Sequence, residues 1–211
     1  MDSINIQLVF YIIILIISLV IHEISHAFAA YIQGDPTPKY QDRLTLNPIK
    51  HLELVGSFLV PLITYFGSVQ VGLPFVFGWA KPVEYNPYNL KNQRWGELWI
   101  ALAGPLSNFI IAIVFGLFMR FGLYTLPDSF LGISVMVIFV NLGLAVFNLV
   151  PIPPLDGSKI LFNLLPYRFN YIRQHLEQYS FILVLVFIFF FSQYLGVVVN
   201  FLFRHLTGVV L

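Results

Sequence analysis

The sequence predicts an all-α polytopic membrane protein with about five to six transmembrane helices and one membrane-embedded hairpin or re-entrant segment. The chain has 211 residues, of which 58% are hydrophobic and only 10% are charged. Its mean hydropathy is +0.83, which is typical of chains that cross a bilayer several times. The apolar residues also gather into runs long enough to span about 30 Å of hydrocarbon. We expect one membrane domain, 1–211, with a core at 4–165 and an accessory helical region at 178–211.

Polar and proline-rich segments separate the expected elements. The first helix is expected at 4–33, and the residues before it carry no Lys or Arg, which argues against a secretory signal peptide. The run 52–80 contains several glycines and prolines. Irregular backbone lies at membrane depth only where protein or a wet cavity surrounds it, so we expect the hairpin or re-entrant segment here. Further spans are expected at 95–120, 131–150 and 181–211, with a short helix at 158–165.

The basic residues predict the topology. Of the 11 Lys and Arg residues, all except Arg120 and Arg204 fall within 34–51, 80–94 and 157–175. Basic connecting segments face the cytosol, so these three segments are expected there and both termini outside. The net charge of +1 gives no indication of nucleic-acid binding.

A polar motif follows the first apolar run: His22, Glu23 and His26 form HExxH. Helical residues four apart lie on one face, so the two imidazoles can bind one zinc ion while Glu23 acts as general base. A charged residue in a membrane segment costs about 2.5–3.5 kcal/mol, so a segment that only spanned the bilayer would not contain this motif. The chain has no Cys, so a third zinc ligand must be His, Asp or Glu.

Asp156 is the strongest candidate for that third ligand. It follows three prolines within 151–154, which must break the preceding helix. Both His22 and Asp156 are reached after an inward crossing, so they are expected near the cytosolic side at similar depth. Asp is also favoured as a helix N-cap and in turns, and the residues alone leave that alternative open.

Other polar residues allow two interpretations each. Asn148 ends an apolar span and could be a satisfied buried amide, while Asn108, four residues after Gly104 on one helix face, could have a site role or could only help helices pack. His51 lies in a basic connecting segment, and we interpret it as a polar residue of that segment rather than as a ligand.

Three motifs in this order resemble the site-2 proteases, a family of intramembrane zinc metalloproteases: HEISH, AGPLSNF and NLVPIPPLDG. YQDRLTLNPIKH and FGWAKPVEYNP are similar to its small bacterial members. The resemblance covers about residues 14–165. It implies one Zn²⁺ per chain with Asp156 as third ligand, and Glu23 as the catalytic base. It also implies that Asn148 contacts the substrate backbone or stabilises the oxyanion, while Asn108 matches a GPxxN motif.

The same resemblance implies a setting and a substrate class. The family cleaves transmembrane segments of membrane proteins, so we expect single-span or peptide-like membrane-protein substrates, the bacterial cytoplasmic membrane, and an active site toward the cytosol. The segment after the HExxH helix is a sheet or hairpin in this family. Small relatives commonly have HxDPxG where this chain has His51, Glu53 and Gly56, so this connecting segment is expected to differ in shape. No PDZ or CBS domain fits in the chain.

Two other functions could use the same residues. A non-catalytic, zinc-stabilised scaffold or chaperone would not need a base, so an intact Glu23 favours an enzyme. A metal-ion transporter usually contains inverted repeats with matching broken helices, and the sequence contains no such repeat. We therefore predict an intramembrane zinc endopeptidase.

Overall fold

The computed structural model describes residues 2–53, 56, 59, 81–122, 126–166 and 169–209. All regular structure in these residues is helical, as the composition predicts. Two short 3-10 helices, η1 (Pro48–His51) and η3 (Pro87–Asn89), lie in connecting segments. The α-helices are α1 (Asp2–Ile32), α2 (Thr37–Tyr40), α4 (Gln93–Gly122), α5 (Asp128–Asn148), α6 (Asp156–Leu164), α7 (Asn170–Gln178) and α8 (Ser180–Thr207).

Three described helices are long and apolar enough to cross a membrane: Val9–Ile32 within α1, α4 and α5. A fourth span results if Tyr171–Gln178 and Ser180–Phe191, which are bent by 71°, count as one. The fold class of an all-helical polytopic membrane protein is therefore confirmed. The prediction was about five to six transmembrane helices, whereas the described residues contain three or four candidate spans. The hairpin or re-entrant segment predicted at 52–80 lies almost entirely outside the described residues.

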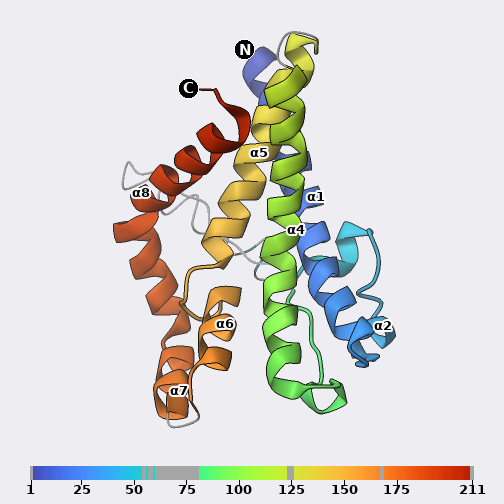
Figure 1. Cartoon of the computed structure of the whole chain (residues 1–211), viewed down its shortest axis with the longest axis vertical. Helices are drawn as coiled ribbons and strands as arrows, with labels where there is room; N and C mark the ends of the chain where they lie inside the picture. The colour runs from blue at the N-terminus through green and yellow to red at the C-terminus, as the bar shows by residue number, and fades with distance from the viewer. Residues whose placement is uncertain are drawn as a thin grey trace.

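The central helix is α4, which packs against α1, α5, α6 and α8. Figure 1 shows α1, α4 and α5 running alongside one another. A cluster made of Ala29, Ala30, Leu90 and Ile100 joins the end of α1 to the start of α4. The small alanines allow these two helices to approach closely. A larger buried cluster joins α4, α5 and α8, and consists of Ala112, Met119, Ile138, Leu142, Val199 and Phe203.

The N-terminal end of α1 and the C-terminal end of α8 lie at one end of the molecule, whereas α2, α6 and α7 lie toward the other (Figure 1). The start of α4 is also at this second end. The three basic segments are therefore gathered at one end, which we call the polar end.

Asp35 joins two connecting segments at the polar end. Its side chain is fully buried. It accepts hydrogen bonds from the backbone N–H and hydroxyl of Thr37, from the backbone N–H of Asn86 and from the side-chain amide of Asn89, at 2.6 to 3.1 Å. Burial by itself would raise the pKa of Asp35, but these donors hold it below its usual range.

Two details at the polar end differ from the sequence-based expectation. The short helix α6 begins at Asp156 rather than at 158. The polar stretch after it contains α7, whose Arg173 and Glu177 form an ion pair of 2.8 Å one helical turn apart. Such a pair stabilises an exposed helix. The sequence did not indicate α7, because Pro166 precedes it and its residues are mostly polar.

Candidate metal centre

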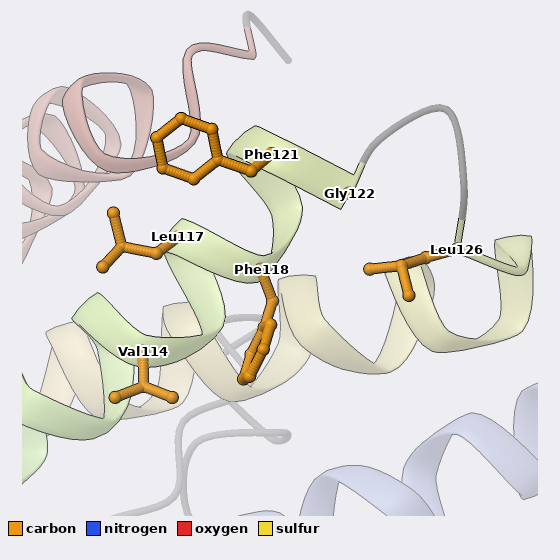
Figure 2. A pocket seen from close by; sticks show the side chains of 6 residues that line it. All are labelled: Val114, Leu117, Phe118, Phe121, Gly122 and Leu126. Atoms are coloured by element: carbon orange, nitrogen blue, oxygen red, sulfur yellow. The ribbon is translucent and has the colours of Figure 1, made fainter.

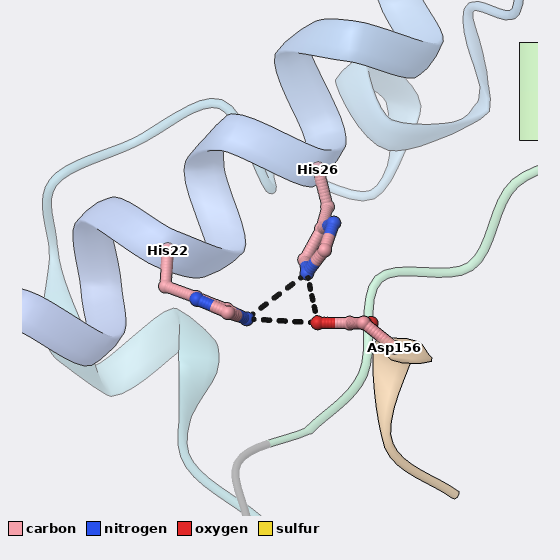
Figure 3. A group of neighbouring side chains, drawn as sticks. All are labelled: His22, His26 and Asp156. Atoms are coloured by element: carbon pink, nitrogen blue, oxygen red, sulfur yellow. Dashed lines mark hydrogen bonds and ion pairs between the residues drawn. The ribbon is translucent and has the colours of Figure 1, made fainter. Parts of the chain in front are cut away.

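His22, His26 and Asp156 converge on one point, as Figure 3 shows. Both histidines come from α1, and Asp156 is the first residue of α6. The His22 Nε2 and His26 Nε2 atoms are 3.1 Å apart, and each lies 3.1 Å from Asp156 Oδ2. All three residues are buried, with at most 7% of their surface exposed. The spacing of four in HExxH thus places both imidazoles on the face of α1 that meets Asp156.

The turn between α5 and α6 delivers Asp156 to the histidines. Residues 149–155 connect the two helices, and the peptide bond between Pro153 and Pro154 is cis. A Cβ on Gly157 would overlap the backbone carbonyls of this turn, so glycine permits the close approach of α6. The N-cap position of α6 is Leu155, and the carboxylate of Asp156 contacts the histidines instead. The N-cap alternative for Asp156 is therefore wrong.

The outer ring nitrogens of both histidines contact α4. His22 Nδ1 lies 2.6 Å from Asn108 Oδ1, and His26 Nδ1 lies 2.6 Å from the carbonyl oxygen of Ile100. Gly104 stands between these two contacts on α4, where an added Cβ would overlap Nε2 of both histidines. On the face of α4 that meets α1, Asn108 and Ile100 therefore orient the imidazoles. Gly104 leaves space for the two Nε2 atoms between them.

The donor set at this point fits a metal ion. The carbonyl of Ile100 can only accept, so His26 Nδ1 carries the proton and its Nε2 directs a lone pair at the cluster. An ionised Asp156 is also only an acceptor. A cation between such atoms compensates their mutual repulsion. Ligand atoms at about 2.0–2.1 Å from a tetrahedral zinc ion are about 3.3 Å apart, close to the 3.1 Å separations of the three atoms.

The remaining predicted residues lie around this cluster. Glu23 follows His22 on α1 and is half-buried. Asn108 lies behind His22, where it contacts the ring rather than the centre of the cluster. Asn148 ends α5 and donates a hydrogen bond to the carbonyl of Leu144 at 2.9 Å. His51 is buried in its connecting segment, with Nε2 2.8 Å from the carbonyl oxygen of Thr45.

Three residues near the cluster had no site role in the sequence analysis. Ser18 lies one turn before His22 on α1, and Asn141 lies on α5; both are buried and hydrogen-bonded to Asn108 or to each other. Gly104 is the third. Polar residues inside apolar spans are expensive, so Asn141 could have been identified from the sequence. The role of Gly104 could not be identified in this way, because it depends on which helix packs against α1.

Two surface pockets differ in their relation to the cluster. One, of about 480 Å³, lies at the far end of α4 and is lined by apolar residues (Figure 2). The other, of about 270 Å³, includes Tyr85, Ser158 and Lys159 and lies beside α6 at the polar end. Burial and the nearby Glu97 carboxylate raise the pKa of Tyr85, so its hydroxyl remains protonated there. Lys159 also approaches Asp156 Oδ1 to 3.9 Å. The second pocket thus opens close to the aspartate.

Comparison with known proteins agrees with this chemistry. The model of peptidase family M50 matches residues 10–130 and 125–191. The "Putative zinc metalloprotease YwhC" of Bacillus subtilis is 38% identical over 185 residues, which are 83% of this chain and 78% of the relative. The "Putative zinc metalloprotease Rip2" of Mycolicibacterium smegmatis is 31% identical over 153 residues, 69% of this chain and 53% of that longer protein.

A shorter match is to the "Putative zinc metalloprotease MJ0611" of Methanocaldococcus jannaschii, which is 49% identical over 63 residues, 29% of this chain and 31% of the relative. No solved structure matches the chain. The family match covers most of the sequence, and the buried His and Asp side chains provide the donors that its chemistry requires. The chain therefore belongs to peptidase family M50, the site-2 protease family, and is an integral membrane zinc metalloendopeptidase.

Proposed function

We propose that this enzyme hydrolyses peptide bonds in or near transmembrane segments of membrane-protein substrates, with zinc held by His22, His26 and Asp156. The observation that carries the proposal is the convergence of these three buried donors between helices of membrane-spanning length. Since α1 and α4, which surround the two histidines, are both long and apolar enough to cross a membrane, we expect a single-span or peptide-like substrate that enters between helices. We assign the whole of 1–211 to one catalytic domain.

His22, His26 and Asp156 would hold the zinc ion, which would supply Lewis-acid chemistry: polarisation of the peptide carbonyl and a water pKa lowered toward about 7. Glu23 is the general base. Its half-buried carboxylate takes a proton from the attacking water as the new C–O bond forms. It then returns this proton to the amide nitrogen as the C–N bond breaks, which releases an amine and a carboxylic acid; the acid gives its remaining proton to the amine or to solvent at neutral pH. Asn148 contacts the substrate backbone or stabilises the developing oxyanion.

We infer that the polar end faces the cytosol of a bacterial cytoplasmic membrane and that both termini lie outside. The inference is supported by the gathering of the basic segments at that end. It is also supported by the open pocket beside α6, whose lining residue Ser158 lies two positions after Asp156. A reporter fused after Gln174 should therefore report the cytosol, and an external signal there would overturn this orientation.

Cleavage by the purified protein tests the role of Glu23. A panel of single-span substrates is compared between the wild type and Glu23→Gln, with Glu84→Gln, at an exposed position, as control. General-base catalysis contributes about 10²–10⁴-fold, so Glu23→Gln should keep its zinc and lose at least about 100-fold in rate, while the control remains active. Equal cleavage by the wild type and Glu23→Gln would refute the assignment of the base.

Metal content tests the role of Asp156. Asp156→Ala should lower zinc occupancy, because it removes one of three protein ligands. Asp128→Ala is the matched control, because Asp128 is an exposed aspartate that is also the first residue of a helix, α5. Unchanged occupancy in Asp156→Ala would exclude it as a ligand, whatever the outcome for Glu23.

A further inference from the structure

We propose that Asn141 is a positioning residue for the metal centre: through Asn108, it fixes which nitrogen of His22 carries the proton. The proposal rests on the proposed zinc ligands and extends them to a residue on α5 that does not touch the cluster. It predicts that a change at Asn141 alters zinc affinity only by way of Asn108.

A buried chain of side chains connects Asn141 to the cluster. Asn141 Nδ2 donates to the carbonyl of Val137 and to Ser18 Oγ, both at 2.9 Å. Asn141 Oδ1 accepts from Asn108 Nδ2 at 2.8 Å. Asn108 Nδ2 also donates to the carbonyl of Ser18 at 3.3 Å, and Asn108 Oδ1 faces His22 Nδ1 at 2.6 Å. Asn108 and Asn141 are completely buried, and Ser18 is 3% exposed.

The orientation of each amide follows from its partner. The backbone carbonyl of Val137 can only accept, so the NH₂ group of Asn141 must face it. The oxygen of Asn141 then faces Asn108 and requires a donor, which is the NH₂ group of Asn108. The carbonyl of Ser18 requires the same donor. Both amides are therefore held in one orientation by carbonyl groups of α1 and α5.

This orientation determines the state of His22. With its NH₂ group directed at Asn141 and Ser18, Asn108 can present only its oxygen to the imidazole, so His22 Nδ1 must carry the proton. His22 Nε2 is then left with a lone pair directed at the cluster, as the carbonyl of Ile100 ensures for His26. Partners of this kind orient a ligating histidine, and their loss typically lowers metal affinity about 10–100-fold.

An alternative is that Asn141 merely helps α1, α4 and α5 to pack. Packing would be affected whether or not Asn108 is present, and it would be affected in the metal-free protein too. A positioning role predicts coupling between Asn141 and Asn108 that appears in zinc affinity. The two explanations can therefore be separated by a double-mutant cycle.

The cycle compares the wild type, Asn108→Leu, Asn141→Leu and the double variant in detergent. Zinc affinity is measured by competition with a chelator, and thermal unfolding is measured without metal. Asn108→Leu should weaken zinc binding about 10–100-fold and Asn141→Leu about tenfold, whereas the double variant should match Asn108→Leu within about threefold. Asn141→Ala, which adds no bulk, is measured in parallel. Asn200→Leu is the control, because exposed Asn200 makes the same bond to a carbonyl four residues earlier, at 2.9 Å.

The outcomes separate this proposal from the proposed function. Additive losses in the double variant, or wild-type affinity in Asn141→Leu and Asn141→Ala, would overturn the positioning role while leaving the zinc ligands intact. A low unfolding temperature without metal, together with equal zinc affinity in the wild type and both Asn141 variants, would show that Asn141 is only structural and would overturn the proposal as well. Zinc affinity that does not depend on Asp156 would instead overturn the proposed site itself.

Discussion

The substitution Gly104→Ala should reduce zinc affinity without damaging the metal-free protein. A Cβ at this position of α4 would lie 2.5 Å from His22 Nε2 and 2.6 Å from His22 Cε1, and would also overlap His26 Nε2. Two of the three overlapping atoms, the Nε2 atoms of both histidines, are proposed to bind the metal, so the rings can relieve the contact only by moving away from the cluster. In the metal-free protein, the rings are held only by their contacts with Asn108 and the Ile100 carbonyl, so turning aside costs less there than when a metal ion is also bound.

The size of the effect follows from these distances. An ordinary Cβ contact is 3.4 Å or longer, so the His22 ring would have to move by about 0.9 Å, against a tolerance of about 0.2 Å in metal–ligand distances. Relieving such an overlap costs about 1–3 kcal/mol. Since 1.4 kcal/mol is a factor of ten, zinc affinity should fall about 5- to 140-fold, and cleavage at limiting zinc should fall with it.

Gly143→Ala on α5 is the matched control, because an added Cβ there meets no atom within 4 Å. Both substitutions gain about 0.5–1 kcal/mol of helix propensity, so the control removes this contribution from the comparison. Chelator competition gives the zinc affinity, and thermal unfolding without metal gives the stability of each variant. Equal zinc affinity in Gly104→Ala and Gly143→Ala would refute the reasoning, since the histidine rings could not then lie against Gly104 in the loaded enzyme.

Three further predictions concern the surroundings of Asp156 and the polar end. Gly157→Ala should lower both the unfolding temperature and the zinc content, because its Cβ would overlap backbone carbonyls that cannot rotate away; an unchanged unfolding temperature would contradict this. Lys159→Met should weaken zinc binding less than about threefold, because Lys159 is partly exposed and 3.9 Å from Asp156 Oδ1; a tenfold loss in the same competition assay would show a stronger role. Asp35→Asn should lower the free energy of unfolding by about 1–3 kcal/mol at pH 7, because its NH₂ group would face the N–H of Asn86. The pKa of Asp35 is lower in the folded state, so its stabilisation is present at neutral pH and is lost as the pH falls below about 4; unfolding scans at both pH values should show the difference shrinking, and a constant difference would be inconsistent with an ionised Asp35.

Local patterns in the sequence were sufficient for much of the fold and for part of the candidate site. The helical spacing of His22 and His26 predicted that they share a face, and the structure has them on one face of α1. The three prolines predicted the end of α5, and the charge distribution predicted that the basic segments gather at one end. Each of these properties depends on residue spacing, helix-breaking prolines or composition within one segment, and all three can be read directly from the sequence.

Topology and the family resemblance predicted one contact between segments, that of Asp156 with the two histidines, but the contacts made by α4 could not be obtained from the sequence. Gly104 and Asn108 were visible as a small residue and an amide four positions apart on one helix, which fits packing as well as a site. Only the position of α1 against α4 gives them different roles, since Gly104 leaves room for the two Nε2 atoms and Asn108 contacts the far side of one ring. Asn141 is recognisable as an amide inside an apolar span, but the sequence does not identify its partners, one of which is a serine of α1 that lies 123 residues away along the chain.

The contacts of α4 make it the helix that orients the two histidines of the metal centre. Two proposed ligands come from α1 and the third from α6, and α4 packs against both helices. The same face of α4 supplies the Ile100 carbonyl to His26 and the Asn108 oxygen to His22, one on each side of Gly104. A rotation of α4 by one residue would move both acceptors and replace the glycine by a side chain, so it would disturb both histidines together. Helix α4 therefore constrains the geometry of a site to which it contributes no proposed metal ligand, and substitutions on this face should affect zinc binding more than substitutions on its lipid-facing side.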